Sequence, residues 1–365
     1  MNRKTTRIIA MVIVLVFTIG LILIINSNLK DKNAEHSLSE EMFAMDTVMK
    51  LTVYETAETD CDLNVVMDEM RERIYLMEKE LSVTDKNSEI SKLNALSSTG
   101  EWMTVSDDVW YLMEKAREIS LSTELDPGSG TRSDSKKAYA FDPTLYPIVK
   151  LWGFAADGEH RVPGEDETEK ELDKVSADHI EMGSASDKHD IRLTDGALVD
   201  LGACAKGYLS DELCEIMKKH HANGVISLGG NVRTLGTKPD GSPFVIGITD
   251  PKDGTSLFTK LESSDEAVIT SGNYERFFEV DGHRYHHIMD SRTGMPAESG
   301  LSSVTVIGEK GLYCDAYATA FFVMGEELTK RYLDTKLQGY KVILIREDGS
   351  YWCSDGVEMI MPDRD

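Results

Sequence analysis

The chain has 365 residues, of which 41% are hydrophobic and 28% charged, and this length corresponds to about two ordinary domains with packed cores. Its composition excludes collagen, coiled-coil and low-complexity architectures. With 39 Lys and Arg against 64 Asp and Glu, the net charge of −25 argues against general binding of nucleic acid, because two polyanions repel each other.

The first thirty residues differ in composition from the rest of the chain. Three basic residues precede an apolar run from Ile8 to Ile25, which is just long enough to cross a bilayer as a helix. Basic residues before such a run place the N-terminus in the cytoplasm and the remaining chain outside the cell membrane. A cleaved signal peptide is the alternative, but the run is longer than a usual signal core and no clear cleavage site follows it. We therefore predict a single-pass signal anchor, a transmembrane helix, at 1–30 and a polar linker at 31–41.

The cysteines indicate neither a disulfide framework nor a zinc site. They show no Cys-x-x-Cys spacing, and an odd number outside the cell leaves at least one thiol unpaired. Cys204 and Cys314 lie inside helical patterns, where a small buried residue is the simplest interpretation. The others are Cys61, Cys214 and Cys353.

Hydrophobic periodicity after the linker predicts an α+β fold. Apolar and polar residues alternate at 45–54, as in a strand, whereas 62–81 carries the apolar stripe of an amphipathic helix. Ser106 is a good N-cap for a second helix that runs through Ile119. Further helices are expected at 163–175, 203–220 and 314–333, and further strands at 191–201, 224–236, 244–249, 267–281, 301–307 and 340–346. Strands grouped with strands favour α+β over a regular βαβ winding.

Two segments place a charged residue where an anionic ligand could bind. Asp142 precedes Pro143, where the backbone is held extended, although Asp-Pro is also common in simple turns. Asp200 leads through small residues into the helix expected at 203–220, and Lys206 near the start of that helix opposes the helix dipole. An anion bound at the helix N-terminus would explain this lysine, whereas close packing of strand and helix is the alternative reason for the small residues.

Two histidines, His286 and His287, end a predicted strand shortly before Asp290. Adjacent side chains on a strand face opposite ways, so only one of the two can face a given site. His287 is therefore a candidate base or ligand. A pair of satisfied surface histidines is the alternative.

Asp315 and Thr319 are one helical turn apart in the helix expected at 314–333, which puts both oxygens on one face. A carboxylate and a hydroxyl suit Mg²⁺ when carbonyl and phosphate oxygens complete the coordination shell. Taken alone, such a face is usually only solvated. Taken with the other segments, it indicates phosphate and metal chemistry at loop ends.

Nine short motifs then establish a resemblance by their residues and their order. They are Met45-Asp46-Thr47, Leu81-Ser82 with Ser88-Glu89-Ile90-Ser91-Lys92-Leu93-Asn94, Phe141-Asp142-Pro143-Thr144, Leu151-Trp152-Gly153-Phe154, Asp200-Leu201-Gly202-x-x-Ala205-Lys206-Gly207, Leu228-Gly229-Gly230-Asn231, Thr270-Ser271-Gly272-x-Tyr274-x-Arg276, His287-Ile288-x-Asp290 and Asp315-Ala316-x-Ala318-Thr319. In this combination the chain resembles the FAD:protein FMN transferases, or ApbE-like flavin transferases, over about residues 42–350. We expect the flavin transferase domain to occupy 42–355.

The resemblance implies a two-lobed, T-fold-like body with FAD held between the lobes. It implies Mg²⁺-dependent transfer of FMN from FAD to a threonine hydroxyl of a target flavoprotein, through a phosphoester bond and with release of AMP. His287 would stand near the acceptor hydroxyl as a base, and Asp290 would orient the imidazole or bind the acceptor peptide. Carried over by position, the FAD contacts are Met45, Ala140, Phe141, Asp142, Asp200, Lys206 and Ile288, and the metal ligands are Asp315, Thr319 and the carbonyl of Ala203.

The chain departs from the family pattern in four places. Asp46 stands where many relatives have Gly, Thr84 where a Tyr often packs on the flavin, and Ser291 where Pro is usual. Between Asp126 and Ala140 there is extra chain, for which we expect a flexible surface insertion.

Two other functions are compatible with the same motifs. An extracytoplasmic FAD-binding protein would keep the FAD contacts without transfer, and an FAD pyrophosphatase would give FMN and AMP with water as the nucleophile. For the transferase, the expected acceptors are outward-facing membrane electron-transport subunits of the Rnf or sodium-pumping quinone reductase (Nqr) type.

Overall fold

The computed structural model describes residues 36–126, 137–155, 158–185 and 188–362. The anchor predicted at 1–30 and residues 127–136 of the expected insertion lie outside these ranges. Within the ranges that are described, none of the helices combines the length and the apolar character needed to cross a bilayer.

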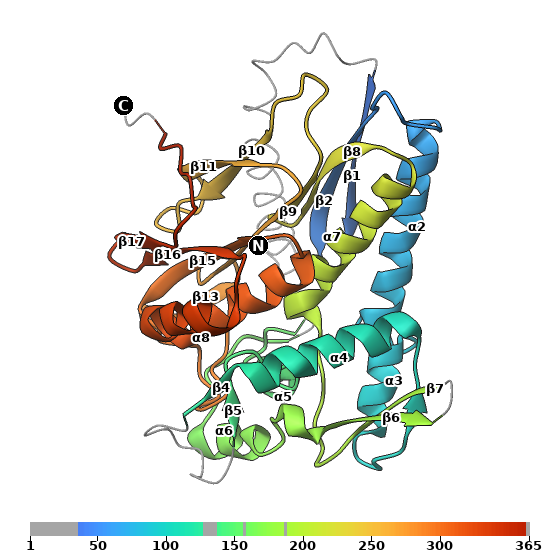
Figure 1. The fold of residues 1–365 in the computed structure, drawn as a ribbon. Coiled ribbons are helices and arrows are strands. Elements are labelled where there is room, and N and C mark those ends of the chain that lie inside the picture. Colours follow the sequence, from blue (N-terminus) through green and yellow to red (C-terminus); the bar gives the residue numbers. More distant parts are fainter. Residues whose placement is uncertain (1–35, 127–136, 156–157, 186–187, 363–365) are drawn as a thin grey trace, which may run out of the picture.

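The central feature is an eight-stranded sheet in which every neighbouring pair of strands is antiparallel (Figure 1). Because the sheet is antiparallel and not built by a regular βαβ winding, the α+β prediction is confirmed. The strands, in order across the sheet, are β1 Ser37–Ala44, β2 Thr47–Tyr54, β8 Asn223–Leu228, β9 Asn231–Leu235, β12 Ala267–Gly272, β15 Leu301–Gly308, β16 Lys341–Arg346 and β17 Tyr351–Cys353.

The linker predicted at 31–41 is wrong for its last residues. Residues 37–41 belong to β1, which pairs with β2 along its whole length. β1 lies at the edge of the sheet, so charged side chains such as Glu41 can point to solvent without disturbing the ladder. This polar composition made the strand look like a linker.

The first two long helices begin at side-chain caps, of which the sequence indicated Ser106. Asp62 and Ser106 each accept a hydrogen bond from a backbone N–H in the first turn of the following helix. The helices expected from these residues are thereby confirmed. The helices are α2 Leu63–Leu81, α3 Glu89–Leu96, α4 Asp107–Ser122, α5 Tyr146–Leu151, α6 Glu165–Leu172, α7 Gly202–Lys219 and α8 Gly311–Lys336.

Helices cover one face of the large sheet and a hairpin covers the other (Figure 1). Helices α2, α7 and α8 form one core with side chains such as Val304 and Val306 of β15. The next residue, Ile307, points to the opposite face and packs with the hairpin of β10, Phe244–Thr249, and β11, Leu257–Ser263. Alternation along one strand thus supplies two cores.

A second group of elements lies beyond the lower end of α2 and α7 in Figure 1. It contains α3, α5, α6 and a three-stranded sheet, and Trp152 and Leu172 lie in a small separate core there. The arrangement agrees with the two lobes expected from the resemblance. The strands of the small sheet, in order, are β3 Met103–Thr104, β7 Lys188–Leu193 and β6 Ile180–Ala185.

Three predicted strands are interrupted where the backbone turns. The strand expected at 191–201 ends with β7 at Leu193, because Asp195 and Gly196 take positive φ angles in a turn. The strand expected at 224–236 is a hairpin that turns at Gly229 and Gly230, both with positive φ. The strand expected at 267–281 divides into β12 and β13, and β13, Phe277–Val280, pairs with β14, His283–His286.

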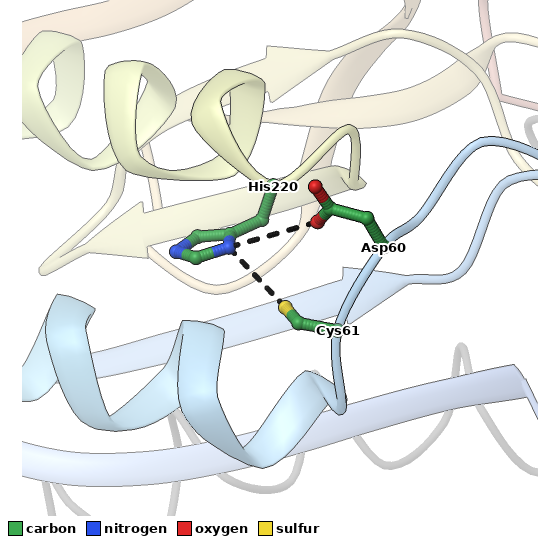
Figure 2. A group of neighbouring side chains, drawn as sticks. All are labelled: Asp60, Cys61 and His220. Carbon is green, nitrogen blue, oxygen red and sulfur yellow. Dashed lines mark hydrogen bonds and ion pairs between the residues drawn. The ribbon is translucent and has the colours of Figure 1, made fainter.

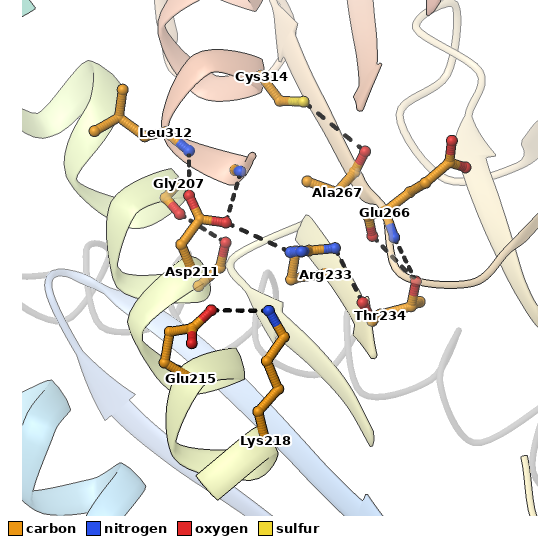
Figure 3. A network of polar contacts seen from close by, with 12 residues as sticks. Gly207, Asp211, Glu215, Lys218, Arg233, Thr234, Glu266, Ala267, Leu312 and Cys314 are labelled. Carbon is orange, nitrogen blue, oxygen red and sulfur yellow. Dashed lines mark hydrogen bonds and ion pairs between the residues drawn. The ribbon is translucent and has the colours of Figure 1, made fainter. Parts of the chain in front are cut away.

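Helices α7 and α8 cross in very close contact at Gly207 and Gly311. A Cβ atom on Gly207 would lie 2.2 Å from the carbonyl oxygen of Gly311, so only glycine allows this approach. Close by, the carboxylate of Asp211 on α7 accepts hydrogen bonds from the backbone N–H groups of Gly311 and Leu312, at 2.8 and 3.0 Å (Figure 3). The buried guanidinium of Arg233 lies 3.5 Å from the same carboxylate. A side chain of one helix therefore caps the start of the other.

Replacement of Gly207 by Ala forces the two helices apart. We expect Gly207→Ala to lower the free energy of unfolding by about 3 kcal/mol, because overpacking against a backbone carbonyl has no flexible neighbour to absorb it. Urea denaturation measures this loss. Gly164→Ala is the matched control, since its Cβ would meet nothing closer than 3.8 Å and its φ is −73°, and equal losses in both variants would contradict the argument.

Candidate functional site

The predicted FAD contacts meet around the start of α7. The backbone N–H of Asp200 donates to the carbonyl of Pro143 at 2.9 Å, which joins the 140–144 segment to the residues before α7. Asp200 itself accepts a hydrogen bond from the N–H of Gly202 at 2.8 Å. Desolvation, with the nearby charge of Asp46 as a smaller cause, raises the pKa of Asp200, and the cations of Arg276 and Lys206 oppose this. Four segments far apart in sequence therefore share one electrostatic environment.

Asp142 shapes its own segment through local hydrogen bonds. Its Oδ1 accepts from the backbone N–H and the hydroxyl of Thr144, at 2.9 and 2.6 Å, in an Asx-type turn. The N–H groups of Ala140 and Phe141 donate to Thr123 at the end of α4. Ala140, Phe141 and Asp142 are all buried, so the 140–144 segment is packed in place and is not an exposed loop.

Ser291 joins the start of this segment to the segment that carries the histidines. Its hydroxyl accepts from the N–H of Tyr139 at 3.0 Å and donates to the carbonyl of the same residue at 2.8 Å. The usual family residue at this position, Pro, has no side-chain group that can make either bond. Ser291, which departs from the family pattern, therefore makes the two hydrogen bonds that join these two parts of the site.

The predicted metal ligands lie at the crossing of α7 and α8. The carboxylate of Asp315 is buried, with one oxygen accepting from the N–H of Gly207 at 2.8 Å and the other from the amide of Asn231 at 3.0 Å. Burial raises the pKa of Asp315, and Lys206, Gly207 and Asn231 oppose that shift. Thr319, one turn later, has its hydroxyl 3.3 Å from that of Ser271.

These ligands are of the type that Mg²⁺ prefers. The N–H of Gly207 in α7 donates to Asp315. Ala203 lies exposed in the first turn of α7, and a carbonyl oxygen has two lone pairs, so it can offer one to a metal even when the helix uses the other. A carboxylate, a hydroxyl and a carbonyl are hard oxygen donors, so the residues present fit a magnesium ion.

Met45 and Asp46 form the tight turn between β1 and β2. Both have positive φ angles, 48° and 59°, as a two-residue hairpin turn requires. The family pattern has Gly at the position of Asp46, and Asp can stand there because it tolerates the left-handed region better than most residues. The N–H of Met45 donates to Glu78 on α2 at 2.7 Å, which fixes the turn beside the other predicted contacts.

The two histidines point to opposite sides, as predicted. His286 turns inward, where its Nε2 lies 3.2 Å from the carbonyl of Ala297 and its ring packs edge-on against Phe322. His287 has Nδ1 3.2 Å from the carbonyl of Arg276. A carbonyl oxygen can only accept, so the proton of His287 lies on Nδ1 and the lone pair of Nε2 is available to take a proton.

Desolvation, followed by the charge of Arg276, lowers the pKa of His287 to about 3, so the ring is neutral near pH 7. The adjacent Ile288 is buried, and its N–H lies 3.3 Å from Nδ1 of His286. Nε2 can accept a proton, but a pKa this low makes the ring a weaker base than imidazole in water, and the negative charge of a bound diphosphate would strengthen it.

Asp290 has a different partner from the one suggested for it. Its carboxylate forms a two-oxygen ion pair with Arg292, the shortest contact being 2.6 Å, and its backbone closes the turn to Gly294 and Met295. The carbonyl of Arg276, not Asp290, orients the imidazole of His287. Binding of an acceptor peptide through Asp290 stays a prediction.

Three residues near the site were not selected from the sequence: Asn231 and Ser271, which were quoted in motifs, and Glu275, which was not. Asn231 and Ser271 contact the two side chains predicted to hold the metal. Desolvation raises the pKa of Glu275 to about 7, with the charge of Asp315 adding to the shift and those of Lys206 and Arg276 opposing it. Asn231 and Ser271 were recognisable as motif positions, but Glu275 fell on a variable position and gave no signal.

The comparisons with known proteins decide the family. Residues 45–344 match the sequence model of the ApbE family. The chain belongs to the ApbE family. It is 32% identical over 308 residues to the FAD:protein FMN transferase of Treponema pallidum, with 80% of each chain covered, and 32% identical over 249 residues to that of Klebsiella pneumoniae, with 68% of this chain and 72% of the relative covered.

Solved structures of ApbE proteins have the same fold. The ApbE protein of Thermotoga maritima superposes with a TM-score of 0.76 at 31% identity, covering 87% of this chain and 97% of that one. The flavin transferase ApbE of Vibrio cholerae gives a TM-score of 0.75 at 26% identity, with the same coverage. The resemblance drawn from the sequence is therefore confirmed at the level of family and fold, while the roles of single residues stay predictions.

The depressed pKa of His287 has a consequence for stability. Between about pH 3 and the unfolded value of about 6.5, the unfolded chain binds more protons at this residue than the native chain, so the free energy of unfolding falls as the pH is lowered through this range. In His287→Gln we expect the loss of stability between pH 7 and pH 5 to shrink by on the order of 1 kcal/mol. Urea unfolding at both values measures it, with His283→Gln on the exposed hairpin as the control. An unchanged loss would show that His287 is not held neutral.

Proposed function

We propose that this chain transfers FMN from FAD to a threonine hydroxyl of an acceptor flavoprotein, with Mg²⁺ as the required metal and AMP as the second product. The observation that supports this best is that the start of α7 joins the predicted FAD contacts to the predicted metal ligand. Asp200 accepts from the N–H of Gly202, and the N–H of Gly207, the residue after Lys206, donates to Asp315. The curated relatives named above carry the name FAD:protein FMN transferase.

The residues can be assigned to the steps of such a transfer. The acceptor oxygen bonds to the phosphorus of the FMN half, the bond from that phosphorus to the bridging oxygen breaks, and AMP leaves with the bridging oxygen. Nε2 of His287 takes the proton from the threonine hydroxyl, since a hydroxyl is a poor nucleophile until a base removes its proton. Lys206 and the start of α7 stabilise the anionic diphosphate.

A magnesium ion held by Asp315, Thr319 and the carbonyl of Ala203 would neutralise negative charge on the phosphoryl oxygens. The surroundings of the site favour a cation there. Asp200, Asp315 and Glu275 bring three carboxyl groups together, against the charges of Lys206 and Arg276. A bound diphosphate carries two negative charges and would increase this excess of negative charge. A metal cation would offset it.

Location and acceptor form part of the proposal. The signal anchor at 1–30 would hold the transferase domain on the outer side of the cell membrane as a single-pass protein. Outward-facing electron-transport subunits of the Rnf or Nqr type would then be within its reach. The FAD-binding protein and the FAD pyrophosphatase remain the alternative functions.

One assay separates the three functions. The full-length protein is incubated with FAD, Mg²⁺ and an acceptor subunit of the Rnf or Nqr type. A fluorescent acceptor band after denaturing electrophoresis indicates transfer, FMN and AMP formed without acceptor indicate a pyrophosphatase, and unchanged FAD indicates a binding protein. Replacement of the acceptor threonine by Ala should abolish the band, and an undiminished band would refute the threonine assignment.

Loss of the carboxylate at 315 should remove transfer. We expect Asp315→Ala to lower the rate at least about 10³-fold at saturating FAD, because the metal loses its one charged ligand. Asp334→Ala, an exposed residue on the same helix, is the matched control and should keep the wild-type rate. Chelation of divalent cations should mimic Asp315→Ala in the wild-type protein. Full activity after thorough chelation would contradict the proposal.

The base has a separate test. We expect His287→Ala to reduce kcat by about 10²- to 10⁴-fold with little change in the KM for FAD, because the residue acts on the acceptor proton. His283→Ala, on the exposed hairpin that precedes it, is the control. A variant that loses FAD binding while keeping kcat would instead make His287 a binding residue.

A further inference from the structure

A second cluster of ligand atoms lies at the other end of α7, away from Asp200 and Lys206. It contains Asp60 and Cys61, which precede α2, and His220, which ends α7 (Figure 2). One ligand atom from each of the three residues lies within 4.8 Å of the others. Among the described residues, these three form the one group of His, Cys, Asp and Glu packed this closely.

The atoms converge on one point, as a metal site requires. Nδ1 of His220 lies 3.2 Å from Sγ of Cys61 and 4.0 Å from Oδ1 of Asp60, and Figure 2 shows both side chains directed at this nitrogen. In a tetrahedral zinc site with Zn–S of about 2.3 Å and Zn–N of about 2.0 Å, the sulfur and nitrogen lie about 3.5 Å apart. Little movement would therefore bring these ligands to bonding distance.

The far side of the imidazole has the partner that metal-binding histidines usually have. Nε2 of His220 lies 3.0 Å from Oε1 of Glu69 on α2, at ion-pair distance. The carboxylate favours a proton on Nε2, which leaves the lone pair of Nδ1 facing Cys61 and Asp60. The contact is not aligned as a hydrogen bond, so a small rotation of the Glu69 side chain would be needed for it to fix the tautomer that a metal needs.

The cluster is held between fixed pieces of backbone. The hydroxyls of Thr56 and Thr59 both donate to the carbonyl of His221, at 2.6 and 3.1 Å, which fastens the loop before α2 to the end of α7. The side chain of His220 is only 12% exposed. The C-terminal end of a helix carries partial negative charge, which favours a cation there.

We infer that Cys61, His220 and Asp60 bind a zinc-type divalent cation, with water in the fourth position and Glu69 supporting the imidazole. A thiolate, an imidazole nitrogen and a carboxylate form a ligand set typical of zinc, whereas Mg²⁺ avoids sulfur. The sequence predicts no zinc site because the cysteine and the histidine are 159 positions apart. Only the fold brings them together.

A reactive cysteine is the competing interpretation. Reactive cysteines lie in electropositive surroundings, whereas Cys61 lies beside the carboxylate of Asp60, so a bound cation suits this position better than a free thiolate. A helix of 18 residues is about 27 Å long, so this site is too distant to take part in chemistry at the start of α7. Its effect would be structural, fastening the loop before α2 to the end of α7.

The test is zinc binding by the full-length protein after removal of bound metal and reduction of thiols. We expect one Zn²⁺ per chain by calorimetry and metal analysis in excess Mg²⁺, and a rise in Tm with zinc concentration. Cys61→Ser and His220→Gln should each weaken binding at least 10-fold, and Glu69→Gln about 10-fold through the imidazole. Cys353→Ser and His221→Gln are the matched controls and should bind as the wild type does.

Two further measurements keep the inference open to refutation. Asp315→Ala must retain the zinc, since it removes only the ligand proposed for magnesium. Cobalt(II) bound to the wild-type protein must show a sulfur-to-metal charge-transfer band, which decides the case even if Cys61→Ser fails to fold. No zinc uptake by the wild type, unchanged uptake by Cys61→Ser, or cobalt bound without that band would each overturn the inference.

Discussion

The close crossing of α7 and α8 is the constraint on which the candidate site depends. Gly207 and Gly311 allow the two backbones to approach, and Asp211 of α7 satisfies the first N–H groups of α8. The same approach brings the N–H of Gly207 within 2.8 Å of Asp315. Helix packing and ligand placement are therefore one feature: a larger residue at the crossing would displace the carboxylate together with the helix.

The electrostatics of the site follow from that geometry. A buried carboxylate is costly unless hydrogen bonds and cations stabilise it, and Asp315 obtains both from Gly207, Asn231 and Lys206. Burial raises the pKa of Asp315 despite these contacts, so a further positive charge nearby would favour its ionised form. A site that lacks positive charge in this way is suited to a cation. With the cation bound, the proposed reaction can place an anionic diphosphate there although the whole protein carries a charge of −25.

The sequence predicted local features well and long-range contacts only through motifs. The Ser106 cap and the apolar stripe at 62–81 locate helices because each acts over neighbouring turns. Edge strand β1 was missed because its polar residues face solvent, and the turn at Asp195 and Gly196 was missed although Asp-Gly is itself a turn signal. The tie between Asp290 and Arg292 was not anticipated, since several partners were open to that carboxylate and only the fold selects one.

Helix α7 connects the two proposed sites, one at each of its ends. Its N-terminal end carries partial positive charge, and a lysine there is unfavourable unless an anion is bound nearby, as the proposed function requires of Lys206. Its C-terminal end carries partial negative charge and ends in His220 among carboxylates, a setting that suits a cation. One helix dipole thus favours an anionic substrate at one end and a metal ion at the other. The two sites lie on one helix, so a cation that orders the C-terminal end of α7 also restricts the motion of its N-terminal end, which carries Lys206 and Gly207. A structural cation can in this way help to hold the residues of the distant site in position.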